Sequence, residues 1–272
     1  MTPDLETFPG TASVWFGPLT GPAWFTRAEH TLHYAASTMK VGVMVAAWRA
    51  IADLDRPVLV HNAHRSAATG TPDFGNDSTD DGDELVWQAM GTRVPLRWLI
   101  TRMIVKSSNL ATNLVIGELD GDFEAVNQVW RDAGATRSHT GRGIEDAAAR
   151  EAGIHNVVTA ADLAALMIAL AEGRLADAEA SREMLDILCA QELREDLVLG
   201  LPEGTRAAVK NGWVTGVRHS TSIVFPDDAP PYALAVCTTG DADDKAACAL
   251  LARVAEASWR LRNGGTPGEA LG

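Results

Sequence analysis

The chain contains the stretch Ser37-Thr38-Met39-Lys40, which is followed directly by the apolar run Val41-Gly42-Val43-Met44-Val45-Ala46-Ala47-Trp48. A helix that begins here places residues i and i+3 on one face, so the Ser37 hydroxyl and the Lys40 amine lie one turn apart. An adjacent amine can take the proton of a serine hydroxyl and activate it as a nucleophile. The helix N-terminus adds free N–H groups where an oxyanion would form. The alternatives are an N-cap serine and a lysine whose ammonium reaches the surface.

Two further polar motifs lie where predicted elements begin or end. Ser107-Ser108-Asn109 opens a second apolar stretch at residues 110–119, and Lys210-Asn211-Gly212 follows a strand-like run at residues 207–209. The order Ser-x-x-Lys, Ser-x-Asn, Lys-x-Gly is the signature of penicillin-recognising serine enzymes. On these residues the chain resembles the class A β-lactamase-like serine hydrolase family, from about residue 12 to the last predicted helix.

The order of predicted elements indicates the fold class. Short strands are expected at both ends of the chain, at 12–16, 23–26, 206–213, 219–225 and 232–238. Helical patterns lie between them and after the last strand. This order predicts an α/β fold of the α+β type, in which one antiparallel sheet built from both termini packs against helices. The resemblance implies the β-lactamase/transpeptidase-like fold with a five-stranded sheet.

We expect a single unit over residues 1–272. Its sheet part covers about 10–60 and 205–262, and its helical part covers about 61–204. Residues 62–83 are polar and predict a long loop. The acidic run at 77–83 partly fits a calcium loop, but position twelve is Gln88, so we expect a solvated acidic loop.

The resemblance implies roles for the second motif. Ser107 would pass a proton to the leaving group, and Asn109 would bind a substrate amide and steady Lys40. The alternative for Ser107 and Ser108 is two competing helix caps. Ser108 stands where the best-known family form has aspartate.

The third motif would line the opposite side of the groove. By the resemblance, Lys210 places positive charge near Ser107 and a substrate carboxylate, and Gly212 lets the strand lie close to the substrate. Asn211 stands where the family has threonine or serine, so an amide N–H would replace the hydroxyl that binds the carboxylate.

Trp213 and Arg218, which follow this motif in the chain, complete the predicted groove. The backbone N–H groups of Trp213 and Ser37 would form the oxyanion hole. Arg218 would clamp a carboxylate, or else is an ordinary exposed arginine.

The family's deacylating glutamate has one candidate here. Glu145 lies at about the right interval after the second motif, within Arg142-Gly143-Ile144-Glu145-Asp146. The spacing from Arg142 differs by one from the family's Arg-x-Glu-Pro, and no proline follows. Glu145 is therefore predicted either as the base of deacylation or as a helix-start or salt-bridging residue.

Composition restricts the partners and the compartment. A formal net charge of −13 argues against nucleic acid and anionic membranes. No apolar window is long enough for a transmembrane helix, and the first residues lack a secretory pattern. We expect a cytoplasmic protein, unless a leader was removed. His61 and His64 have no companions that would complete a zinc site, so we predict no metal and no cofactor, and the oligomeric state stays open.

Together these observations predict a serine hydrolase or acyltransferase that forms an acyl-enzyme at Ser37. Its substrate would be a small ester or amide that bears a carboxylate. The missing leader, Asn211 and the unusual Glu145 segment favour an esterase, a carboxypeptidase-like enzyme or a biosynthetic acyltransferase. The alternatives are a class A β-lactamase that hydrolyses β-lactams and a non-catalytic ligand-binding module on the same fold.

Overall fold

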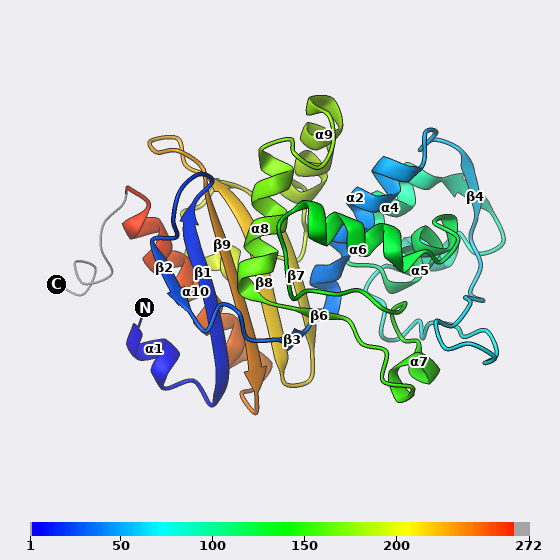
Figure 1. Cartoon of the computed structure of the whole chain (residues 1–272), viewed down its shortest axis with the longest axis horizontal. Coiled ribbons are helices and arrows are strands. Elements are labelled where there is room, and N and C mark those ends of the chain that lie inside the picture. Colours follow the sequence, from blue (N-terminus) through cyan, green and yellow to red (C-terminus); the bar gives the residue numbers. More distant parts are fainter. Residues whose placement is uncertain (1, 264–272) are drawn as a thin grey trace.

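A five-stranded antiparallel sheet forms one half of the molecule in the computed structural model, which describes residues 2–263 (Figure 1). Its strands are β1 (Gly10–Pro18), β2 (Phe25–Arg27), β7 (Arg206–Val214), β8 (Val217–Phe225) and β9 (Tyr232–Gly240). They lie in the order β2-β1-β9-β8-β7. The pairing of β1 with β9 joins the two ends of the chain, and β7 is an edge strand. This confirms the predicted sheet and fold class.

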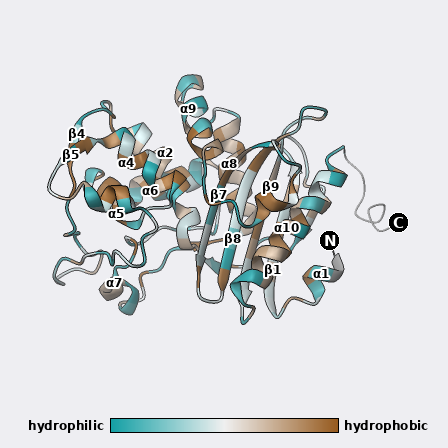
Figure 2. Cartoon of the chain, turned by 180° about the vertical axis from the view of Figure 1, so that it is seen from behind, coloured by the Kyte–Doolittle hydropathy of each residue, from teal (hydrophilic) through white to brown (hydrophobic). Residues whose placement is uncertain are grey.

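Helices cover both faces of the sheet. Side chains alternate along β9, as the period of a strand requires. Val236 joins the apolar cluster that includes α10 (Asp244–Leu261), whereas Ala235 joins the cluster that includes α8 (Ala160–Ala171). Figure 2 shows β9 as largely apolar and the outer turns of α9 (Ala178–Cys189) as hydrophilic.

The remaining elements are short. The other helices are α1 (Thr2–Glu6), α2 (Lys40–Ala50), α3 (Glu84–Gln88), α4 (Leu96–Val105), α5 (Asn109–Glu118), α6 (Phe123–Asp132) and α7 (Ala147–Glu151). Two small sheets pair β3 (His33–Tyr34) with β6 (Val157–Val158), and β4 (Pro57–Leu59) with β5 (Arg93–Pro95). Two 3-10 turns lie at Ala36–Met39 and Leu197–Gly200.

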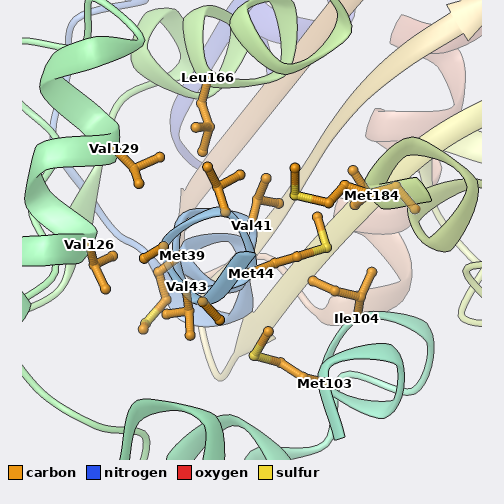
Figure 3. Packing of buried hydrophobic residues seen from close by; sticks show 14 of the residues in the cluster. Met39, Val41, Val43, Met44, Met103, Ile104, Val126, Val129, Leu166 and Met184 are labelled. Atoms are coloured by element: carbon orange, nitrogen blue, oxygen red, sulfur yellow. The ribbon is translucent and has the colours of Figure 1, made fainter. Parts of the chain in front are cut away.

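Helix α2 passes through the middle of the largest core. Every residue from Lys40 to Ala47 is buried, which is typical of a helix that has no solvent face. Figure 3 shows Val43 and Met44 of this helix among side chains from the surrounding helices. Because Lys40 is the first residue of this buried helix, its ammonium group lies inside the protein.

The structure refines one prediction about local structure and confirms another. The helix predicted to start at Ser37 begins instead as a 3-10 turn and becomes α-helical at Lys40. Residues i and i+3 also lie on one side of a 3-10 turn, and the alignment of the Ser37 and Lys40 side chains stays a prediction. Residues 62–83 form the predicted long loop, with one isolated bridge between His64 and Phe74.

The predicted unit of residues 1–272 extends past the described residues at position 1 and at 264–272. Its division into a sheet part and a helical part stays a prediction. No helix within residues 2–263 has the length and apolar character needed to cross a membrane.

Candidate active site

Ser37 lies where the edge strand of the sheet meets the start of the buried helix. Gly212 on β7 presses against its turn: a Cβ at Gly212 would stand 2.5 Å from the Ser37 backbone N and 2.9 Å from that of Thr38. Only glycine permits this approach. The preceding Ala36 has a φ of 45°, a strained conformation of the kind that gathers at functional sites.

The Lys40 ammonium is enclosed by the second motif. Its Nζ donates to the Ser107 carbonyl at 2.6 Å, to Ser107 Oγ at 3.3 Å, to Ser108 O at 3.5 Å and to Asn109 Oδ1 at 2.9 Å. The side chain is fully buried. Desolvation lowers the pKa of Lys40 from 10.5 to about 7, against the opposing charges of Asp81 and Glu145. Near neutral pH a large fraction of Lys40 can therefore accept a proton.

Ser107 connects the two lysines of the site. Lys210 Nζ donates to Ser107 Oγ at 3.0 Å and to the Asn211 carbonyl at 2.8 Å. Lys210 is fully buried, and desolvation, followed by the charge of Lys40, lowers its pKa well below 10.5. Ser107 has a φ of 57°. The cap of α5 is Ser108, whose Oγ accepts the Ala111 N–H, so Ser107 is not the helix cap.

Glu145 approaches the same cluster through Asn109. Asn109 Nδ2 donates to Glu145 Oε1 at 2.9 Å, and the Asp77 N–H donates to Oε2 at 2.7 Å. Glu145 has a φ of 68° and precedes Asp146, which caps α7. Among the described ion pairs none includes Glu145. Glu145 thus stands one residue before the cap of α7, and its role as the base of deacylation or as a helix-start residue stays a prediction.

Asparagines that the sequence analysis missed hold the Glu145 loop. Asn113 Oδ1 accepts the Ile144 N–H at 2.9 Å, and its Nδ2 donates to Ile144 O at 2.8 Å. Asn156 Oδ1 accepts the Arg142 N–H at 3.0 Å, and its Nδ2 donates to Arg142 O at 3.0 Å. The i, i+4 spacing of Asn109 and Asn113 on one helix was a usable signal, because it places both amides on one face.

The prediction that the acidic run at residues 77–83 is a solvated loop is wrong at two positions. Asp81 and Asp83 are 7% and 1% exposed. Asp81 Oδ2 accepts from Ser108 Oγ at 3.0 Å and from the Leu110 N–H at 2.9 Å. Asp83 accepts two hydrogen bonds from Arg102 at 2.6 Å each. Asp81 thus supplies, from another segment, a carboxylate beside the position where the family motif carries its own aspartate.

The geometry of the edge strand directs an N–H toward Ser37. The β7–β8 hairpin turns through two residues, so Val214 and Val217 close it as a hydrogen-bonded pair. Bonded and non-bonded pairs alternate in an antiparallel ladder, and the next pair, which contains Trp213, is non-bonded. The Trp213 N–H therefore points away from β8, toward the edge where Gly212 meets Ser37. An oxyanion hole built from the Ser37 and Trp213 amides requires this direction.

Asn211 and Arg218 do not reach the groove, which corrects two expectations. Asn211 is fully buried, and its Nδ2 donates to Leu193 O at 3.0 Å and to Asp196 Oδ2 at 3.2 Å. Side chains alternate along a strand, so Asn211 faces away from the side of Lys210. Arg218 is 2% exposed, and its Nη2 donates to Asp196 Oδ2 at 2.9 Å. It is a buried structural arginine rather than a clamp or an exposed residue.

A cavity of about 570 Å³ opens beside Ser37. The residues that line it include Tyr34, Ser107, Asn109, Arg142, Glu145 and Trp213. Within residues 2–263 no group of three or more histidine, cysteine, aspartate or glutamate side chains is placed to hold a metal ion. The cavity therefore places two serine side chains and a carboxylate around a space that fits a small molecule, with the buried amines of Lys40 and Lys210 behind Ser107.

Comparison with solved structures shows the same fold. A β-lactamase from Sphaerobacter thermophilus DSM 20745 is 25% identical, with a TM-score of 0.74 over 94% of this chain and 92% of that one. A mutant of the class A β-lactamase of the last common ancestor of Gram-negative bacteria is 20% identical, with a TM-score of 0.80 and 96% of each chain covered. A mutant of PBP-A, solved as an acyl-enzyme complex with penicillin G, is 22% identical, with a TM-score of 0.76 over 94% and 91% of the two chains.

Sequence comparison gives the family. No curated protein matches the chain. A family model described as the β-lactamase enzyme family matches residues 2–261, which is nearly the whole chain. The three motifs that suggested the resemblance all lie inside this match. The protein thus belongs to the β-lactamase enzyme family and is a serine hydrolase of that family.

Proposed function

We propose that the protein hydrolyses a small ester or amide that bears a carboxylate, through an acyl-enzyme at Ser37. One observation carries the proposal: Lys40 and Lys210, both fully buried, donate to Ser107 Oγ beside the cavity that Ser37 lines. This arrangement gives a proton a short route from the nucleophile to a leaving group.

In the acylation step, neutral Lys40 takes the proton of Ser37 as Oγ attacks the substrate carbonyl carbon. The Ser37 and Trp213 N–H groups stabilise the oxyanion. Collapse of the tetrahedral intermediate breaks the bond to the leaving group, which receives the proton from Lys40 through Ser107. The hydrogen bond from Lys210 Nζ to Ser107 Oγ favours this transfer, because it stabilises the oxygen as its proton leaves.

In the deacylation step, Glu145 activates a water molecule that attacks the acyl-enzyme. The bond from Asn109 to Glu145 supports this role, because the same Asn109 accepts from Lys40. This placement favours water over an amine as the acyl acceptor. A β-lactam is the second candidate substrate, since it is a cyclic amide with a carboxylate and the related PBP-A mutant forms an acyl-enzyme with penicillin G.

Intact-mass spectrometry tests the proposal. The protein is mixed with benzylpenicillin and, separately, with p-nitrophenyl acetate. We expect a mass gain that decays within minutes, is absent from Ser37→Ala and is retained by Ser78→Ala, which changes an exposed loop serine. A persistent adduct would contradict hydrolysis and point to acyl transfer. The absence of any adduct with either compound would favour a binding module.

A further inference from the structure

We propose that Arg142, with Tyr34 beside it, binds an anionic group on the acyl portion of the substrate, and that this group is a carboxylate. The inference rests on the proposed function and adds a substrate class to it. It also replaces two of the three residues that the sequence offered for a carboxylate, since Asn211 and Arg218 face away from the cavity. The third, Lys210, donates to Ser107 Oγ.

Arg142 is a buried cation that forms no ion pair with any residue the structure describes. It is 3% exposed and yet lines the cavity beside Ser37. Its Nη1 donates to the Gly143 carbonyl at 3.1 Å and its Nη2 to the Tyr34 hydroxyl at 3.3 Å, while the buried Nε has no hydrogen-bond partner in the described part of the chain. Arginine is almost never buried without a partner charge.

None of the ion pairs found within residues 2–263 includes Arg142. The other cations that line this cavity are different. Lys106 pairs with Glu192, and Arg150 is exposed to solvent, where its charge is hydrated. Arg142 is therefore the buried guanidinium of the cavity whose charge the described chain leaves unmatched.

The position of Arg142 is fixed before any ligand arrives. Asn156 holds both its backbone N–H and its carbonyl. The guanidinium lies over the Tyr34 ring, 5.6 Å from the centroid, and Tyr34 belongs to β3, which pairs with β6. His219 Nε2 also bonds the Tyr34 carbonyl at 2.9 Å. A guanidinium fork held in this way matches the two oxygens of a carboxylate.

The loop that carries Arg142 indicates which part of the substrate it meets. Glu145 follows three residues later in the same loop, whereas Lys210 and Ser107, the groups nearest the leaving group in the proposed mechanism, come from β7 and the start of α5. When Glu145 activates water, the leaving group has departed and only the acyl group remains. The anionic group beside Arg142 thus belongs to the acyl portion.

A matched pair of esters tests the inference. Mono-p-nitrophenyl glutarate and p-nitrophenyl pentanoate have acyl chains of equal length. The first chain ends in a carboxylate and the second in a methyl group. We expect the wild type to have a kcat/KM about tenfold higher for the glutarate ester, by release of p-nitrophenol. Arg142→Gln should lose this preference, because its kcat/KM for the glutarate ester should fall about tenfold more than that for the pentanoate ester, and Arg142→Lys should keep part of it. Arg150→Gln removes an exposed charge from the same cavity and should keep the preference.

The possible outcomes separate the inference from the proposed function. If the wild type has no preference, or if Arg142→Gln slows both esters equally, the inference is wrong and the Ser37 hydrolase stands. If Ser37→Ala releases p-nitrophenol from both esters as fast as the wild type, the proposed function is wrong. In that case, calorimetric titration with glutarate tests the anion site without any reaction. Weaker binding of glutarate to Arg142→Gln than to the wild type supports the site, and equal binding or no binding overturns it.

Discussion

Lys40 acquires its chemistry from the packing of the helix that it begins. The residues after it are buried on every side of α2, so the chain carries the ammonium into the core. There the ammonium donates hydrogen bonds to Ser107, Ser108 and Asn109. Removing an ammonium from water favours its neutral form, which is the form a general base requires.

The pH dependence of acylation follows from this burial. Since the pKa of Lys40 is lowered to about 7, the neutral base is scarce below that pH and dominant above it. We expect the acylation rate of Ser37 to rise about tenfold per pH unit below pH 7 and to level off above it. Stopped-flow measurement from pH 5 to 9 gives the profile, and a flat profile would exclude Lys40 as the base. Lys40→Arg should be slow throughout, because arginine stays protonated.

Replacing Glu145 separates the two halves of the reaction. Glu145→Gln keeps the shape of the side chain but cannot take a proton from water. We expect deacylation to slow by about a hundredfold or more, while acylation changes by less than about fivefold. The adduct lifetime is measured by intact mass, with Glu151→Gln on the exposed face of α7 as the control. An unchanged lifetime would remove Glu145 from the mechanism.

At the scale of elements, the site depends on the contact between β7 and the turn that carries Ser37. Gly212 brings the two backbones together, and the hairpin register directs the Trp213 N–H to the same edge. The turn itself is strained at Ala36, whose φ is 45°. The oxyanion hole is therefore a property of two packed backbones rather than of any side chain.

A single methyl group at Gly212 should separate these elements. The Cβ of Gly212→Ala would lie 2.5 Å from the Ser37 backbone N, so the strand or the turn must shift. We expect the free energy of unfolding to fall by about 1–3 kcal/mol and acylation to fall by at least about a hundredfold. Urea denaturation and adduct formation measure the two effects.

Gly117→Ala is the matched control for this substitution. Gly117 lies in α5, and a Cβ there meets nothing within 4 Å. The added methyl group should raise stability by about 0.5–1 kcal/mol, because alanine favours a helix more than glycine does. Equal acylation by Gly212→Ala and the wild type would contradict the backbone contact as the basis of the oxyanion hole.

At the scale of the molecule, an ion network centred on the buried Arg218 joins the sheet to the segments that precede β7 and follow β9 in the chain. Arg218 on β8 donates to Asp196, which lies between α9 and β7, and to Asp244 at the start of α10. Asp196 is fully buried and also accepts from Asn211. This network fixes β7 from the side opposite the cavity and so supports the position of the edge strand.

Breaking this network should destabilise the whole fold. Arg218→Met leaves the Asp196 carboxylate buried without its partner, and we expect the free energy of unfolding to fall by about 3–5 kcal/mol. Arg206→Met breaks the exposed pair with Asp186, whose side chains are 50% and 71% exposed, and should cost at most about 1 kcal/mol. Chemical denaturation of both variants gives the comparison. Similar falls in the free energy of unfolding of the two variants would show that the Arg218 network stabilises the fold no more than an exposed ion pair does.

The amino-acid sequence by itself determined the local features of this protein. The motifs at Ser37, Ser107 and Lys210 and the order of strands and helices could all be predicted, since each depends on residues close together in the chain. The period of a strand also contained the signal that Asn211 and Lys210 face opposite sides.

Only the tertiary structure decided which distant groups meet. It turned Arg218 toward Asp196 and brought Asp81 to the start of α5. It also placed Arg142 beside the cavity with its Nε unbonded within residues 2–263. A charged side chain takes its role from the partner that folding brings to it, because burial makes an unmatched charge costly. Those partners lie tens to more than a hundred residues away, where no local pattern of sequence reports them.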